Sequence, residues 1–206
     1  MGYIKICWLF IIFTLLLTGC TGVEKEKPSS IGKITIAPYN MSEKESLLIS
    51  KTGVDEIGFF KFAGDLKGDN DLQFAVELYE NGKLKEVLLA TSNEPKAKFK
   101  DSLISFGISK ILDEDHTLKL TAGTPTGLNT AIYPTKMKVT TSSFIKLVGE
   151  KVTLEKNKPI YFAAWLGTTK NGLRSVGSEK GELPTGIEDA EIALVYRVLW
   201  TDMYKK

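Results

Sequence analysis

The chain has 206 residues, and its 27 lysines and arginines nearly balance its 25 aspartates and glutamates, which leaves a net charge of +2. This balance, with Arg174 and Arg197 as the only arginines, argues against the basic surface of a nucleic-acid-binding protein. One histidine and two cysteines leave few components for a zinc site, a Ser/His/Asp triad or a disulfide framework. We therefore predict no nucleic-acid partner, cofactor, resident metal or catalytic residue.

The chain begins with a short apolar leader. Lys5 supplies one positive charge, an uncharged run from Cys7 to Leu17 follows, and the small residues Thr18 and Gly19 end the leader. This arrangement is typical of an export signal. A run of about a dozen apolar residues is too short to span a bilayer, which requires about 20.

The tetrapeptide Leu17-Thr18-Gly19-Cys20 resembles the lipobox of bacterial lipoproteins. The resemblance implies that residues 1–19 are removed as a lipoprotein signal peptide and that the thiol of Cys20 carries a diacylglycerol. Membrane lipid would then be a partner through acylated Cys20, on the extracytoplasmic face of the cell membrane. Secretion after cleavage without lipid attachment is the alternative.

The residues after the lipobox divide into a tether and a folded part. Residues 20–32 are poor in apolar side chains, alternate in charge at residues 24–27 and contain Pro28-Ser29-Ser30, so we predict an acylated amino terminus and a flexible tether. Residues 33–206 show no second linker and no repeat, and we predict a single β-rich domain there.

The clearest structural pattern is a β-hairpin. Residues 72–80 and 83–91 both show two-residue periodicity, and Asn81-Gly82 joins them. This pair suits a type I′ turn, because both of its central positions need positive φ.

The turn also predicts the register and faces of the hairpin. With Glu80 and Lys83 beside the turn, the expected opposite pairs are Val76 with Val87, Phe74 with Leu89, and Glu77 with Glu86. The expected core face carries Leu72, Phe74, Val76 and Leu78. The expected partly exposed face carries Ala75, Glu77, Tyr79, Glu86 and Leu88.

Further short apolar segments follow at intervals, rich in β-branched and aromatic residues and separated by Gly, Asn, Asp and Pro. Nine or ten strands at this spacing predict an all-β fold, either an antiparallel β-sandwich or a jelly roll, with an immunoglobulin-like topology as one option. The segments span residues 34–37, 47–50, 57–63, 103–108, 117–121, 139–148, 152–154, 160–166 and 192–200.

Signals for helices are sparse. Ser42 with Glu45 three residues later is typical of a helix start, but Ser50 and Gly53 leave little length. Residues 187–198 fit a helix or a strand, and β-favouring side chains from Ile192 onward favour a strand.

Two acidic turns are candidates for a weak cation site. Asp113 and Asp115 precede the single histidine, His116, and hard cations prefer such oxygen ligands. Residues 65–71 contain Asp65, Asp69 and Asp71 but depart from the calcium-loop spacing. We interpret both segments as polar turns.

Three further groups could form a site. Glu77 and Glu86 could act as the acid and base of a glycosidase if the register sets them opposite each other. Turns at residues 123–127, 167–172 and 181–186 could form a rim at one end of a sandwich. The aromatic group, which could bind sugar rings but more commonly fills a core, comprises Trp165, Trp200, Tyr161 and Tyr196.

These patterns favour a membrane-anchored, non-enzymatic binding or accessory module with an envelope protein or glycan as partner. An envelope glycan-acting enzyme and a structural or exclusion lipoprotein that contacts a membrane complex are the alternatives. Arg197 is unusual in an apolar segment and is expected to pair with Glu188, Asp189 or Glu191 or to mark a polar pocket.

Overall fold

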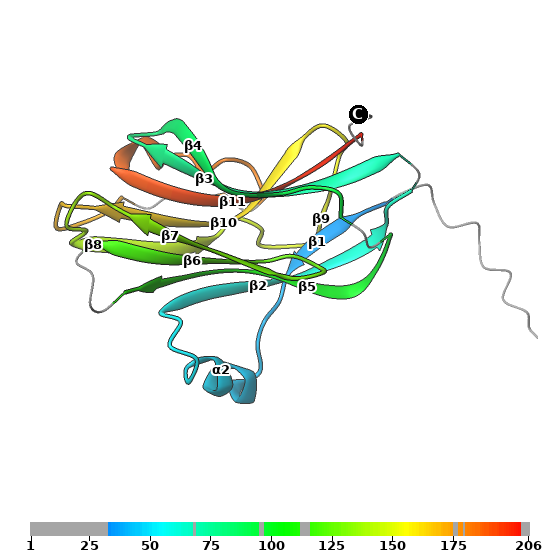
Figure 1. Cartoon of the computed structure of the whole chain (residues 1–206), viewed down its shortest axis with the longest axis horizontal. Helices are drawn as coiled ribbons and strands as arrows, with labels where there is room; N and C mark the ends of the chain where they lie inside the picture. Colours follow the sequence, from blue (N-terminus) through cyan, green and yellow to red (C-terminus); the bar gives the residue numbers. More distant parts are fainter. Residues whose placement is uncertain are drawn as a thin grey trace, which may run out of the picture. The chain divides into compact units, whose positions relative to one another are not determined.

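The computed structural model describes residues 33–67, 69–94, 97–111, 116–174, 177–178 and 180–202. Within them, two antiparallel sheets pack face to face, and one short helix stands beside the lower sheet (Figure 1). The predicted all-β antiparallel sandwich is confirmed. The predicted signal peptide and tether, with Cys20, lie outside the described residues.

Sheet A has the strand order β7-β6-β5-β2-β1-β9, and sheet B has the order β4-β3-β11-β10-β8. All strand pairs within both sheets are antiparallel. The strands are β1 (Thr35–Pro38), β2 (Glu56–Asp65), β3 (Asn70–Glu80), β4 (Lys83–Thr91), β5 (Lys98–Lys110), β6 (Thr117–Gly123), β7 (Leu128–Pro134), β8 (Thr141–Lys146), β9 (Val152–Thr153), β10 (Pro159–Thr168) and β11 (Ile192–Asp202). The helices are α2 (Glu43–Ile49) and the short 3-10 helix η1 (Ile187–Asp189).

Aromatic side chains join the two sheets across the core. Phe60 of β2 meets Phe162 of β10 edge-on with ring centroids 5.0 Å apart, and Phe162 lies 4.4 Å from the ring of Tyr196 on β11. Phe106 of β5 reaches the same Tyr196 ring at 5.5 Å. All four side chains are buried, and burial of each large apolar group contributes about 1.5–3 kcal/mol.

The hairpin forms as predicted at its turn, where Asn81 and Gly82 both have positive φ and Glu80 pairs with Lys83. The predicted register further along is wrong, because two irregularities each add one residue of β4 to the ladder. The observed pairs are Leu78 with Glu86, Glu77 with Val87, Val76 with Leu89, and Phe74 with Thr91.

The exposure predicted for the hairpin is correct on one face only. The core face of β3 is buried as expected, but Ala75, Glu77 and Tyr79 on the opposite face are buried as well. The connection between β10 and β11 causes this burial, because its apolar side chains cover the outer face of sheet B. The covering side chains are Leu173, Leu183, Ile187 and Ala190.

Three other predictions have different outcomes. The strand beginning at Ile192 is confirmed, and η1 immediately precedes it. Residues 47–50 were predicted as one of the apolar strand segments, but residues 47–49 belong to α2. Strand β7 was not predicted, because its sequence alternates weakly and ends in Pro134.

Candidate functional site

Helix α2 begins where the sequence offers a complete amino-terminal cap. The Ser42 side chain accepts a hydrogen bond from the Glu45 backbone N–H at 3.3 Å, and Ser42 N–H donates to Glu45 Oε2 at 2.8 Å. This reciprocal pair satisfies two amides that the first helical turn leaves free. The helix ends after Ile49, and Gly53 with a φ of 75° then reverses the chain. The capping signal in the sequence was therefore correct, and the helix is seven residues long.

One hydrogen bond ties α2 back to the chain that leads into it. The Tyr39 hydroxyl donates to Glu45 Oε1 at 2.6 Å. Beside this contact, an apolar cleft of about 200 Å³ separates the helix from sheet A. Its lining comprises Tyr39, Met41, Glu45, Leu48, Ile49, Phe59 and Leu103. No residue of α2 is buried, and Figure 1 shows the helix standing off sheet A.

The Glu45 carboxylate should respond to pH through this network. The Tyr39 hydrogen bond, followed by those from Ser42, lowers the pKa of Glu45. The same Tyr39–Glu45 hydrogen bond, followed by burial, raises the pKa of Tyr39. Because the folded pKa is lowered, the support that Glu45 gives to α2 is present above about pH 4.3, the ordinary glutamate value. That support is lost as the pH falls through the lowered pKa.

We expect Tyr39→Phe to raise the pKa of Glu45 toward its ordinary value, because the phenylalanine ring keeps the packing and removes the hydrogen bond. Titration of the Glu45 carboxyl carbon by NMR in both chains measures this shift. Ser42→Ala is the matched comparison and should also raise the pKa of Glu45. An unchanged Glu45 titration in Tyr39→Phe would show that the hydrogen bond does not form in solution.

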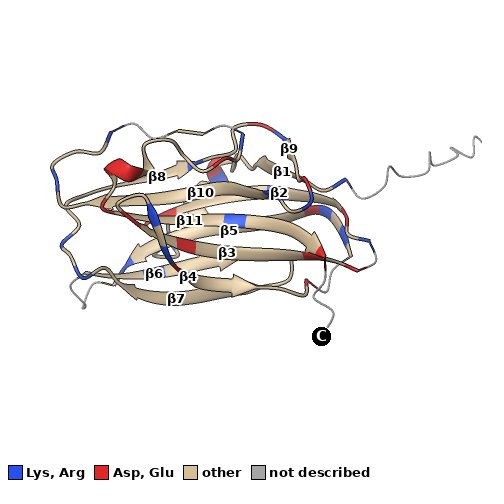
Figure 2. Ribbon diagram, turned by 90° about the horizontal axis from the view of Figure 1, so that it is seen from above, with Lys and Arg blue, Asp and Glu red and all other residues tan. Residues whose placement is uncertain are grey.

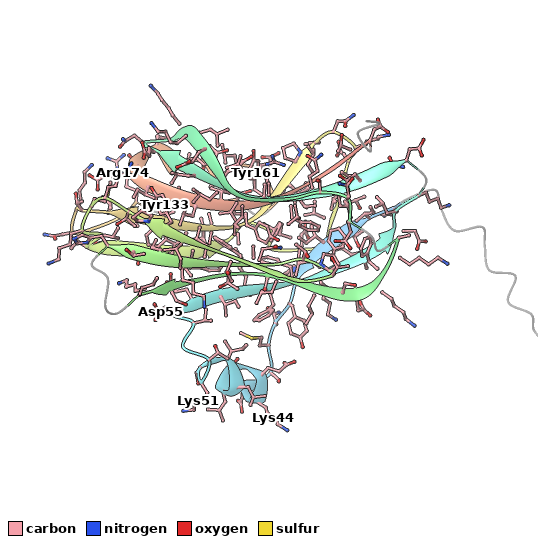
Figure 3. The ribbon with its side chains drawn as sticks, in the orientation of Figure 1. Lys44, Lys51, Asp55, Tyr133, Tyr161 and Arg174 are labelled. Atoms are coloured by element: carbon pink, nitrogen blue, oxygen red, sulfur yellow. The ribbon has the colours of Figure 1, made fainter. Side chains whose placement is uncertain are left out.

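The outer side of α2 combines apolar and basic side chains. Leu47 and Leu48 are 60% and 61% exposed. Lys44 within the helix and Lys51, two residues beyond its end, are exposed too. Leu48 also lines the cleft toward sheet A, so it lies at the edge of this outer surface. Figure 3 shows the labelled Lys44 and Lys51 on the side of the helix that faces away from the sandwich. The result is a small convex surface, which we call the α2 face and define as Lys44, Leu47, Leu48 and Lys51.

The carboxylates that were candidates for an acid and base do not come together. Glu77 pairs with Val87 and Glu86 with Leu78, so the two carboxylates are one register position apart. Neighbouring positions in a strand point to opposite faces of a sheet. Leu78, the partner of Glu86, points into the main core, whereas Glu77 lies on the same face as Tyr79 of the outer cluster. The register therefore does not bring Glu77 and Glu86 together as the acid and base that a glycosidase would need.

Glu77 instead belongs to a buried polar group on the outer face of sheet B. Its carboxylate accepts a hydrogen bond from the Tyr79 hydroxyl at 2.9 Å and forms an ion pair with Arg197 Nε. Figure 2 shows the basic segment in the middle of β11 beside the acidic segment of β3. The side chains of Glu77 and Arg197 are 6% and 18% exposed. Arg197 thus pairs with Glu77 and with none of the three carboxylates expected from the sequence.

A tyrosine pair extends this group toward β10. Desolvation, followed by hydrogen bonds with Tyr161 and Glu77, raises the pKa of Tyr79. Tyr79 therefore stays protonated and keeps donating to the carboxylate. Arg197 and Tyr79 both bind the Glu77 carboxylate. Its negative charge is therefore stabilised by groups of the protein itself and is not directed toward a ligand.

The aromatic residues mostly fill the interior. Trp165 and Tyr196 are 1% exposed, so the prediction that they pack in the core is confirmed and the sugar platform is wrong for both. Trp200 packs half-buried against the main core, and Tyr161 packs half-buried against the smaller apolar cluster on the outer face of sheet B.

The acidic turns have separate outcomes. Asp113 and Asp115 lie outside the described residues, and His116 is exposed with a φ of 67°. Asp71 is 1% exposed, and its Oδ1 accepts the backbone N–H groups of Leu72 and Glu94 at 2.8 and 3.1 Å. These two hydrogen bonds stabilise the start of β3. The residues that the structure describes contain no group of three or more His, Cys, Asp or Glu side chains placed to hold a metal ion.

Two of the three turns that were expected to form one rim lie apart. In the turn at residues 123–127, Thr126 donates to Glu94, whose backbone N–H binds Asp71 near the start of β3. The turn at residues 167–172 is tied to Glu191, beside the end of β3. The shared rim is therefore wrong, because these two turns contact opposite ends of β3.

The α2 face was missed because residues 47–50 were interpreted as a strand segment. The sequence did contain a signal for it, since Lys44, Leu47, Leu48 and Lys51 follow the helical spacing i, i+3, i+4 and i+7 directly after the Ser42 cap. None of the helices in the described ranges has the length and apolarity of a membrane-spanning segment.

Comparison with known families gives one match. A family model described as the YgaN domain matches residues 35–199, a range that includes α2 and the Glu77–Arg197 pair and begins after Cys20. Neither a curated protein nor a solved structure matches the chain.

Proposed function

The chain belongs to the YgaN domain family, and we propose that it is a lipid-anchored, non-enzymatic binding or accessory protein on the extracytoplasmic face of the cell membrane. The observation that carries this proposal is Leu17-Thr18-Gly19-Cys20 directly after an apolar leader with one basic residue. Removal of residues 1–19 would also remove Cys7, so Cys20 would supply the only thiol of the mature chain. Two or three acyl chains hold a protein on a bilayer far more firmly than one.

The arrangement of side chains supports a contact role over catalysis. Of the two candidate acid–base residues, Glu77 is buried, and its carboxylate already binds the Arg197 guanidinium and the Tyr79 hydroxyl. The α2 face, in contrast, exposes adjacent leucines on an element that projects from the sandwich. Exposed apolar groups on a projecting element favour association with another surface.

An accessory lipoprotein that contacts a membrane complex shares both of these features. It would use the same anchor and the same α2 face, and it differs only in the partner. The glycan-acting enzyme has no comparable support, since its two proposed carboxylates face different sides of sheet B.

Replacement of Cys20 by alanine should abolish lipid attachment. In cells supplied with a clickable palmitate analogue, we expect the wild-type chain to take up label and Cys20→Ala to take up none, because only the thiol accepts the diacylglycerol. The Cys20→Ala chain should either keep its leader or leave the membrane fraction. Thr21→Ala is the matched control, since it changes the next residue and leaves the thiol in place.

The proposal fails if the wild-type chain carries no label. It also fails if Cys20→Ala is labelled as strongly as the wild-type chain, because the acyl group would then be attached elsewhere.

A further inference from the structure

The α2 face has the composition of a small membrane-contacting surface. Its leucines, Leu47 and Leu48, keep more than half of their surface in contact with water, although Leu48 also lines the apolar cleft between the helix and sheet A. Leu103 of β5, which lines the same cleft, is 45% exposed. Folding therefore leaves these apolar side chains uncovered together.

The basic residues of the face suit an anionic lipid surface. Lys44 and Lys51 form no ion pair within the described part of the chain, so their charges are available to a partner. Of the two carboxylates of α2, Glu43 is exposed and Glu45 is bound by Tyr39 and Ser42. Lysine stems can lie along apolar surface while their ammonium groups remain among headgroups. The face thus offers leucines to the acyl boundary and positive charge to the headgroups.

Chain length keeps this face near any membrane to which Cys20 is attached. The 13 residues from Cys20 to Gly32 have a fully extended length of at most roughly 45 Å. From Lys33, strand β1 leads within nine residues to Ser42, a contour of at most about 32 Å. α2 is therefore the first helix after the tether and lies within reach of the anchored surface.

We propose that the α2 face docks onto the lipid surface that holds Cys20, with Leu47 and Leu48 entering the interface and Lys44 and Lys51 contacting anionic headgroups. This inference rests on the proposed lipid anchor and names the partner of the α2 face. The anchor supplies the attachment, so the face needs only weak intrinsic affinity because tethering raises its effective concentration at the bilayer. Docking would fix which side of the sandwich faces the membrane.

Other exposed apolar residues fit this role less well. Leu84 and Val87 of β4 are 55% and 47% exposed, but they lie on an edge strand that also carries Lys83, Lys85 and Glu86. Mixed charges of this kind are typical of a protected sheet edge. Leu84 therefore provides a control position of similar exposure on the same tethered chain.

The experiment uses the full lipidated chain with an environment-sensitive fluorophore on one introduced cysteine. Leu48→Cys and Leu84→Cys are labelled in separate chains, since acylation of Cys20 leaves no other thiol in the mature protein. Each chain is reconstituted into protein-free vesicles of phosphatidylcholine with or without phosphatidylglycerol. Nitroxide lipids in the same vesicles report contact with the bilayer.

We expect the emission at position 48 to shift to the blue and to be quenched by nitroxide lipids, more strongly with phosphatidylglycerol. The label at position 84 should show neither effect. Combined Lys44→Glu and Lys51→Glu in the Leu48→Cys chain should remove the dependence on phosphatidylglycerol.

The possible failures can be told apart. A chain that does not float with vesicles lacks the anchor, and both the proposed function and this inference fall. A chain that floats while position 48 remains in water, or responds like position 84, overturns only the docking of α2. A shift that appears in native membranes and not in protein-free vesicles also overturns it, because the partner would then be a membrane protein.

Discussion

Replacing Glu77 by leucine is expected to lower the free energy of unfolding by about 3 kcal/mol. The substitution would leave the Arg197 guanidinium mostly enclosed without its carboxylate, and removal of one member of a buried ion pair costs about 3–5 kcal/mol. We expect a loss at the lower end of this range, because the Arg197 side chain keeps 18% of its surface exposed and can recover some hydration. Arg197 Nη1 already lacks a hydrogen-bond partner among the described atoms, so the network has no second acceptor in place.

Urea unfolding followed by the fluorescence of Trp165 and Trp200 measures this loss. Arg197→Met in the Glu77→Leu background should recover stability, since the double variant no longer buries an unpaired charge. Tyr79→Phe is the milder control, because it removes one hydrogen bond, worth about 1 kcal/mol, and retains the ion pair. If Glu77→Leu is as stable as the wild-type chain, the pair does not exist in solution.

Gly64→Ala is expected to destabilise the fold by about 3 kcal/mol or more. Gly64 has a φ of 136°, and a side chain there would collide with the Lys33 carbonyl oxygen and lie 2.8 Å from the Cα of Ile34. The obstacle is backbone, which cannot rotate away as a flexible side chain can. The substitution would separate β2 from the segment that begins β1, immediately after the predicted tether.

Gly53→Ala provides the matched control. Gly53 also has positive φ, at 75°, but no atom lies within 4 Å of the position where its Cβ would be. Its substitution should therefore cost only the backbone strain, about 1–2 kcal/mol. Thermal unfolding measures the stability of both variants. The difference between their losses gives the cost of the steric collision at Gly64 apart from the backbone strain that both variants share. Equal losses in the two chains would show that the close approach of Gly64 to Lys33 does not limit stability.

Local signals in the sequence were sufficient for the class of fold and for its turns. The two-residue periodicity of β3 places Leu72, Phe74 and Val76 in the core, and Asn81-Gly82 forms the turn that its φ preferences favour. These features depend on neighbouring residues only, so one segment contains all the information that determines them.

The two irregularities in β4 could not be predicted in the same way. Lys85 and Leu88 are the added residues, and each lies in a stretch that fits an alternating strand in more than one register. Which register β4 adopts against β3 depends on contacts between β4 and the rest of the sandwich. The predicted opposition of Glu77 and Glu86 failed for this reason.

The burial of Glu77 depends on contacts that are distant in the sequence. Arg197 is 120 residues away from it, and the segment that covers the outer face of sheet B follows β10. The sequence did indicate that this connection is partly buried, because apolar residues recur within it at Leu173, Leu183 and Ile187. Which surface such a segment covers depends on topology, and the sequence left the topology open.

The central claim is that Cys20 is the acylated amino terminus of the mature protein, and the most direct measurement is the mass of its amino-terminal peptide. Protein extracted from membranes should yield a peptide that begins at Cys20 and carries a diacylglyceryl group on the thiol. A mature chain that begins at another residue, or a Cys20 with a free thiol, would contradict the account.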